Sequence, residues 1–169
     1  MYHAGVIHLR VPGTLRYRDL AVRVVGSACK LVGATDMDTG PFRINSDWDN
    51  QVVSAFGEAF NNAAIHSYSA ASKPGDVEIE VDTGPTYITI RLLDFGSSFD
   101  PDAVPSPDLD TLPESGLGLF IIRSFMDEVT YAPGSPNVLS MTKHLSPHNR
   151  PPQKPRDLKH DNGGGSSRQ

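Results

Sequence analysis

The 169-residue sequence has few of the features that mark secreted, membrane-spanning or nucleic-acid-binding proteins. It contains one cysteine, Cys29, so no disulfide can form within the chain, which suits a reducing compartment. No apolar run approaches the about 20 residues that cross a bilayer, and no basic segment followed by an apolar one marks a secretory signal. Lys and Arg number 15 against 20 Asp and Glu, whereas phosphate backbones are bound by clustered basic residues. We therefore expect a cytoplasmic protein without direct contacts to membrane or nucleic acid.

The composition predicts one folded domain followed by a basic tail. Hydrophobic residues make up 38% of the chain, which is enough to bury a core in a domain of this size. Residues 146–169 hold five Lys or Arg against two Asp or Glu, four prolines and a run of three glycines. Few apolar residues are present there to offset the entropy of ordering, so this tail is expected to be disordered. The expected domain, residues 1–145, then has a net charge of −8, from 10 basic and 18 acidic residues.

Two stretches in the first half have the periodicity of amphipathic helices. Residues 15–32 carry apolar side chains at helical spacing, namely Leu20, Val24, Ala28 and Leu31. A second helix is expected from a cap at Ser46 to about Tyr68, with an inner face of Val52, Phe56, Ala59 and Ala63. Alternating apolar residues predict a strand at 6–11, and residues 41–44 form a short candidate strand.

The second half is predicted to be mainly strands. Residues 77–82 alternate apolar and acidic side chains, and 86–93 follow after a tight turn. A helix is expected from Gly116 to about Met126, followed by strands at 129–131 and 138–145. Because tight turns join consecutive strands, the sheet should be mixed and mainly antiparallel. About three helices would cover one face, which makes the fold a two-layer α/β (α+β) sandwich.

Three short segments carry side chains suited to phosphoryl chemistry. Glu58, Asn62 and His66 recur every four residues on the second helix, so a carboxylate base and an amide oxygen suited to Mg²⁺ would share one face. Taken alone, such a row has an alternative interpretation without catalysis, as the solvent-facing side of an amphipathic helix. His66 has its own alternative, a structural role near the helix end.

The second and third segments lie in loops next to regular structure. Asp94 and Gly96 directly follow a strand, where a carboxylate can accept a hydrogen bond from an adenine amine and a glycine admits close approach of a base. The alternative is an ordinary turn. Gly116 and Gly118 open a helix, whose exposed N–H groups and dipole favour an anion. Here the alternative is a glycine-rich helix start with a core face that includes Leu119.

Together the three segments resemble a known family in order and spacing. The pattern E-x-x-x-N-A-x-x-H-x-Y begins at Glu58, D-x-G-x-x-F-D begins at Asp94, and G-x-G-L begins at Gly116, with Met-Asp-Glu-Val following at residues 126–129. The chain resembles the bacterial anti-sigma factor serine kinases of the RsbW and SpoIIAB type. These belong to the GHKL (HATPase_c) ATPases, which share the Bergerat ATP-binding fold. The resemblance covers about residues 5–145.

The resemblance implies a cofactor and a set of site residues. ATP or ADP would bind with Mg²⁺, Glu58 would be the catalytic base, and Asn62 would hold the metal. Asp94 would bind the adenine amine and Gly96 would shape that pocket. The remaining nucleotide-binding residues would be the phosphate-lining Gly116, Leu117, Gly118 and Leu119, and the pocket walls Phe95 and Ile121.

The resemblance also implies partners. The protein would sequester a sigma factor and phosphorylate a serine on an antagonist protein, and it would work as a homodimer. The alternative is a nucleotide-binding module that sequesters a partner with weak or no kinase activity. A histidine kinase or a gyrase-like hydrolase is less expected, because neither a phosphoacceptor hairpin nor a transducer domain is visible in the sequence.

Two residues depart from the family pattern. Ser98 stands where many members have glycine, and the acidic Glu114 stands where some have a basic residue that meets the γ-phosphate. No Lys or Arg lies between Arg91 and Arg123, while the stretch beyond Asp94 holds five acidic residues: Asp100, Asp102, Asp108, Asp110 and Glu114. These charges repel a triphosphate. We therefore expect phosphoryl transfer to be slow until a partner supplies positive charge.

Overall fold

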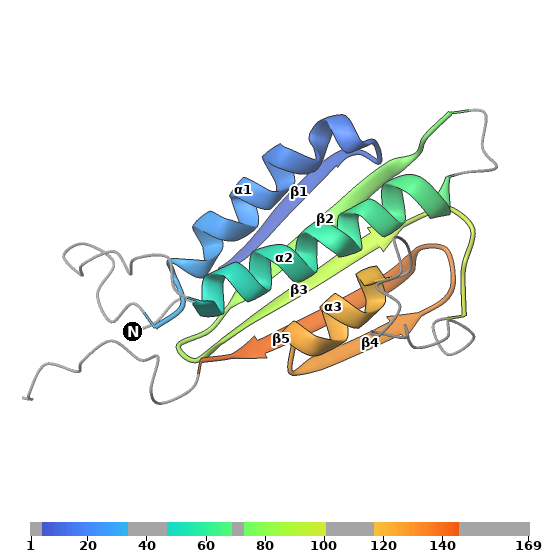
Figure 1. Cartoon of the computed structure of the whole chain (residues 1–169). Helices are drawn as coiled ribbons and strands as arrows, with labels where there is room; N and C mark the ends of the chain where they lie inside the picture. The colour runs from blue at the N-terminus through green and yellow to red at the C-terminus, as the bar shows by residue number, and fades with distance from the viewer. Residues whose placement is uncertain (1–4, 34–46, 69–72, 101–116, 146–169) are drawn as a thin grey trace, which may run out of the picture.

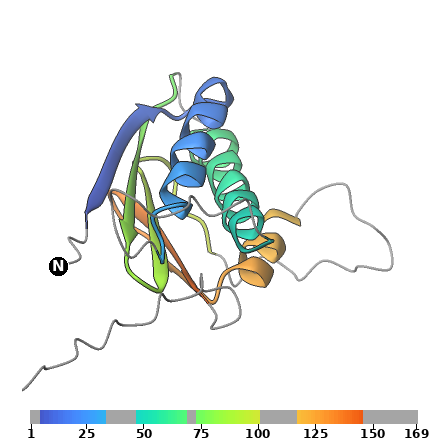
Figure 2. The same ribbon diagram turned by 90° about the vertical axis from the view of Figure 1, so that its left-hand side faces the viewer.

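A computed structural model describes residues 5–33, 47–68, 73–100 and 117–145. These ranges form one antiparallel sheet with α-helices packed on one of its faces (Figures 1 and 2). The strands are β1 (Val6–Pro12), β2 (Asp76–Thr83), β3 (Tyr87–Asp94), β4 (Glu128–Ala132) and β5 (Asn137–His144). The helices are α1 (Arg18–Cys29), preceded by a short turn Leu15–Tyr17, α2 (Asp47–Asn62), extended by a π-helical turn Ala63–Ser67, and α3 (Leu117–Phe125). The predicted two-layer α/β sandwich is confirmed.

The strand order β1-β2-β3-β5-β4 decides which residues meet at the edges of the sheet. Every strand pairs antiparallel with its neighbours. The last residue of β3, Asp94, lies opposite Val77 on β2 and opposite Asn137, the first residue of β5. Because β3 pairs with both β2 and β5, residues distant in sequence meet at this end of the sheet.

The hydrophobic core lies between the sheet and α2, and it follows the predicted pattern. The predicted inner face of the second helix is buried, with Val52, Phe56 and Ala59 on α2 and Ala63 on the π-helical turn. Against it pack the buried positions of the middle strands, which alternate with half-exposed ones as expected. Figure 2 shows the two layers edge-on, with α2 over the centre of the sheet.

The apolar spacing in α1 did not identify the side that is buried. Leu20 and Leu31 are 49% and 39% exposed, and of the spaced residues only Ala28 is fully buried. The helix instead buries Ala21 and Val25, which have no exposed surface. Because α1 packs against both α2 and β2, the tight space selects small side chains and leaves the leucines outside.

Polar contacts fix the beginning of α2. The buried Asp49 carboxylate accepts from Lys30 Nζ at 3.2 Å, which ties α2 to the residue after α1. Trp48 Nε1 donates to the His144 carbonyl at 2.8 Å, so this side chain anchors the helix to the end of β5, as its expected packing role requires. The predicted cap at Ser46, the strand at 41–44 and the tail at 146–169 lie outside the described residues. Within the described ranges, no helix has the length and apolar character needed to cross a membrane.

Candidate functional site

The first motif lies at the C-terminal end of α2, where the helix changes its pitch. Glu58 and Asn62 are both half-buried and lie one turn apart on this helix. The next five residues form a π-helical turn, a feature that is frequent at functional sites. The wider turn breaks the spacing that the predicted row of three required. His66 is exposed on this turn, whereas Glu58 and Asn62 stay together on the regular helix.

The first turn of α3 lies directly against these two side chains. A Cβ atom placed on Gly118 would lie 3.3 Å from Glu58 Oε2 and 3.3 Å from Asn62 Oδ1. The first and third motifs, 60 residues apart in sequence, thus form one cluster, in which any side chain at position 118 would press on Glu58 and Asn62. Leu117, Leu119 and Ile121 are half-buried on the same helix. Gly116 lies outside the described residues.

This cluster suits a magnesium nucleotide in its donor set. Mg²⁺ is held in proteins by one or two oxygen ligands, together with water and substrate phosphates. The Asn62 amide oxygen beside the Glu58 carboxylate supplies such oxygens, and the beginning of α3 carries the positive end of a helix dipole. Among the described residues, no three His, Cys, Asp or Glu side chains gather into a closed metal cage.

The second motif lies where β3 ends, and its carboxylate is held by the protein. Asp94 is 6% exposed, and its Oδ1 accepts from the Gly96 backbone N–H and from Asn137 Nδ2, each at 3.0 Å. Asn137 is not among the predicted site residues. Its only sequence signal is its place at the start of the last strand, because the register of β3 with β5 decides that it faces Asp94.

Gly96 is required by a close approach to the protein backbone. A Cβ atom at this position would lie 2.0 Å from the carbonyl oxygen of Ser67, far inside contact distance. The next residue, Ser97, donates its N–H to the same carbonyl at 2.8 Å. We expected this glycine to admit a flat base, whereas the close approach in the structure is to the end of the α2 extension. The second motif therefore packs on the end of the first.

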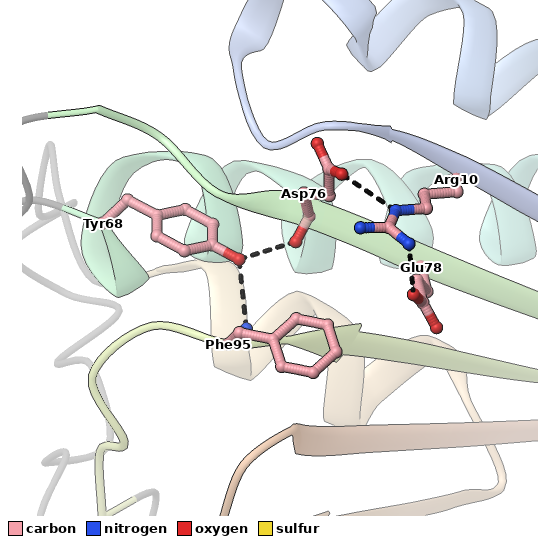
Figure 3. Close-up of polar contacts among 5 residues, drawn as sticks. All are labelled: Arg10, Tyr68, Asp76, Glu78 and Phe95. Atoms are coloured by element: carbon pink, nitrogen blue, oxygen red, sulfur yellow. Dashed lines mark hydrogen bonds and ion pairs between the residues drawn. The ribbon is translucent and has the colours of Figure 1, made fainter.

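Tyr68 joins three elements at this point (Figure 3). Its hydroxyl donates to the Asp76 carbonyl at 2.6 Å and accepts from the Phe95 N–H at 3.0 Å, so it links the start of β2 to the residue after β3. Burial raises the pKa of this phenol, the hydrogen bond from Phe95 opposes the rise, and the negative charges of Asp94 and Asp76 add to it. Tyr68 closes the first sequence motif, yet no role was predicted for it.

Phe95, a predicted wall of the base pocket, has an exposed side chain. The residue is 48% exposed, and in Figure 3 its ring points away from Tyr68. A planar apolar ring next to a buried carboxylate is a surface on which a base can stack. Phe95 and Gly96 thus stay beside Asp94, while Glu58, Asn62 and Gly118 form the neighbouring cluster at the same end of α2.

Comparisons with known proteins agree with this arrangement. Residues 12–143 match the family described as histidine kinase-like ATPase domain. The chain belongs to this family. Proteins named serine-protein kinase RsbW from Staphylococcus aureus strains bovine RF122 / ET3-1, MRSA252 and JH9 are each 33% identical over 147 residues. The aligned region covers 82% of this chain and 86% of each relative, so the resemblance drawn from the three motifs is confirmed.

Replacing Tyr68 by phenylalanine should destabilise the fold in a pH-dependent way. At neutral pH, Tyr68→Phe leaves the Asp76 carbonyl without its donor, and we expect a loss of about 1–3 kcal/mol in unfolding free energy. The folded pKa of the phenol lies above its unfolded value of 10.0, so the stabilisation is complete below that pH and falls as pH rises through the folded pKa. Urea unfolding followed by Trp48 fluorescence measures both effects.

The difference between wild type and Tyr68→Phe should therefore shrink above about pH 10. Tyr17→Phe, which removes a phenol hydroxyl from a half-buried residue just before α1, is the control. A difference between wild type and Tyr68→Phe that stays constant from pH 7 to 11 would contradict the role given to the Tyr68 hydroxyl.

Proposed function

We propose that this chain is an ATP-dependent serine-protein kinase that also acts as an anti-sigma factor. It sequesters a sigma factor and phosphorylates a serine on the antagonist of that factor. The observation that carries the proposal is the contact of Gly118 with Glu58 and Asn62, because it joins a base and a metal ligand to a helix N-terminus. The relatives named serine-protein kinase RsbW support the same activity.

ATP or ADP would bind across both clusters of the site. The Asp94 carboxylate accepts a hydrogen bond from the exocyclic amine of adenine, and Phe95 and Ile121 contribute apolar surface to the base. Gly118 and Leu119, at the beginning of α3, would hold the phosphates. The Asn62 oxygen would hold Mg²⁺, which neutralises phosphate charge when it is bound. Asn62 ends α2, Asp94 ends β3, and the other residues lie directly after β3 or on α3.

Glu58 would act on the partner serine during transfer. Its carboxylate takes the proton of the serine hydroxyl while that oxygen bonds to the γ-phosphorus and the bond to the β-phosphate oxygen breaks. The products are phosphoserine and ADP. Because Glu58 lies on a rigid helix, the proton acceptor is positioned before the partner arrives. The new phosphate carries about −1.5 to −2 charges, which would help to separate the antagonist from an acidic kinase.

The homodimer would form along the β1 edge of the sheet. Strand β1 pairs only with β2 in the described sheet, so its outer edge is open to a second copy. Beside it lies a hollow of about 460 Å³, lined by Ile7, Arg23, Val24, Ser27, Ala28 and Leu31. The exposed Leu20, one turn before Val24 on α1, continues this apolar surface. An open edge together with exposed apolar side chains favours association of two copies.

Nucleotide binding should depend on Asp94. Asparagine places an amide nitrogen donor where the adenine amine would donate, so we expect Asp94→Asn to weaken ADP binding at least about tenfold. Isothermal titration calorimetry with ADP and Mg²⁺ measures this, and Asp82→Asn on the neighbouring strand β2 is the control. Equal affinity of wild type and Asp94→Asn would contradict adenine recognition by this carboxylate.

Phosphoryl transfer should depend on Glu58 far more than binding does. Glu58→Gln keeps the shape of the side chain but removes the base, so we expect at least a 100-fold lower rate of transfer, on the order that general bases contribute. ADP affinity should change less than about threefold. Transfer from radiolabelled ATP to antagonist proteins of the same organism measures the rate, and mass spectrometry identifies the modified serine.

A nucleotide-binding module without kinase activity is the second candidate. It is favoured by the sequence between Arg91 and Arg123, which contains no basic residue to meet a phosphate. Residues 101–116, with most of the acidic side chains of this stretch, lie outside the described residues. Wild-type protein that binds ADP but transfers no phosphate to any antagonist would support this alternative, and Glu58→Gln would then have no effect.

Dimerisation should be broken by a charge in the hollow beside β1. We expect wild type to sediment at about twice the chain mass of 18.3 kDa, and Val24→Glu to sediment as a monomer. Thr130→Glu, on the opposite edge strand β4, should leave the dimer intact. A monomeric wild type at micromolar concentration in analytical ultracentrifugation would contradict this interface.

A further inference from the structure

We propose that Asn137 and Ser98 position the Asp94 carboxylate and thereby set the preference of the site for a base with an exocyclic amine. The inference rests on the proposed function, because it concerns the recognition of the nucleotide base. Neither residue was predicted to act at the site, and Ser98 was noted only as a departure from the family pattern.

Asn137 uses its whole side-chain amide within the protein. The residue has no exposed surface and lies at the start of β5, opposite Asp94. Its Nδ2 donates to Asp94 Oδ1 at 3.0 Å and to the Gly96 carbonyl at 3.1 Å. Its Oδ1 accepts from the Ser98 hydroxyl and, at 3.0 Å, from the Gly134 N–H. This one buried side chain thus connects the end of β3, the loop after β3 and the turn between β4 and β5.

These partners determine which way the amide points. Asp94 Oδ1 and the Gly96 carbonyl can only accept, whereas the Gly134 N–H can only donate. A flipped amide would place oxygen against oxygen on one side and N–H against N–H on the other. Because two contacts of the nitrogen and the Gly134 contact of the oxygen would become repulsive, the observed orientation is strongly preferred. The amide donors are therefore held toward Asp94.

The network engages one oxygen of the Asp94 carboxylate and leaves the other oxygen for the ligand. Oδ1 accepts from both Asn137 Nδ2 and the Gly96 N–H. Among the described residues, no hydrogen bond ends on Oδ2. The carboxylate thus cannot turn without losing two hydrogen bonds, and Oδ2 stays a pure acceptor. Such an acceptor attracts an amine and repels a carbonyl oxygen at the same position of a base.

Ser98 supports Asn137 from the loop that follows β3. Its hydroxyl donates to Asn137 Oδ1, a contact that glycine at this position could not make. The same loop is held at the next residue, because the Phe99 N–H donates to the Tyr131 hydroxyl at 3.3 Å and the two rings lie 4.4 Å apart. The loop is therefore fastened to the β4–β5 hairpin before any base binds. Ser98, where many family members have glycine, and Asn137 thus act together through this hydrogen bond.

The test compares ADP with inosine diphosphate, whose base has a carbonyl oxygen in place of the amine. Calorimetric titrations of both nucleotides with Mg²⁺ yield, for wild type and each variant, the ratio of the affinity for ADP to the affinity for inosine diphosphate. We call this the selectivity ratio. We expect Asn137→Ala to lower the ratio about tenfold and Ser98→Ala about threefold, as expected for a lost bond to a charged group and to a neutral one. Thr142→Val, which removes the hydrogen bond to Thr89 elsewhere on β5, should leave the ratio unchanged.

The ratio separates positioning from a general loss of structure. A merely structural role would lower the affinities for both nucleotides equally, and an unchanged ratio in Asn137→Ala would overturn the inference. If Trp48 fluorescence shows that Asn137→Ala does not fold, the ratio for Ser98→Ala decides, because that hydroxyl lies on an exposed loop. Selectivity that is lost in Asp94→Asn but kept in both variants would refute this inference alone. A wild type that binds no ADP would refute the proposed function with it.

Discussion

The packing of the loop after β3 onto the end of the α2 extension is the constraint on which the site depends. At Gly96 the two backbones approach so closely that no side chain fits between them, and Ser97 adds a hydrogen bond to the Ser67 carbonyl. Tyr68 reinforces the junction by linking β2 to Phe95. Since α2 carries Glu58, this junction places the carboxylates of Asp94 and Glu58, which we propose bind the nucleobase and accept the serine proton, at one end of the fold.

The position of α3 follows from contacts at both of its ends. At its beginning, Gly118 lies against Glu58 and Asn62, so any larger residue would press on both side chains. At its end, the buried Lys143 ammonium of β5 donates to the Phe125 carbonyl, where a positive charge is favoured by the helix dipole. The helix that would receive the phosphates is thus fastened to the sheet at the end that lies away from them.

The two proposals about the nucleotide place different demands on the same fold. Phosphoryl transfer needs a base, a metal ligand and a helix N-terminus close together, and local helix geometry with one glycine supplies them. Base recognition needs a carboxylate that does not rotate, and this comes from strand register and a buried amide. Transfer and recognition can therefore be altered separately, by substitutions at Glu58 and at Asn137.

The amino-acid pattern by itself determined the element order, the buried face of α2 and the closeness of Glu58 to Asn62. All of these follow from periods of two or about four residues that act along one element. It did not identify the buried face of α1, because packing on two neighbours selects small residues rather than the most apolar ones. Three further contacts are decided only by the tertiary structure: Gly96 with Ser67, Gly118 with Glu58, and Asn137 with Asp94. Each joins residues distant in sequence, and only strand register and helix packing bring such residues into contact.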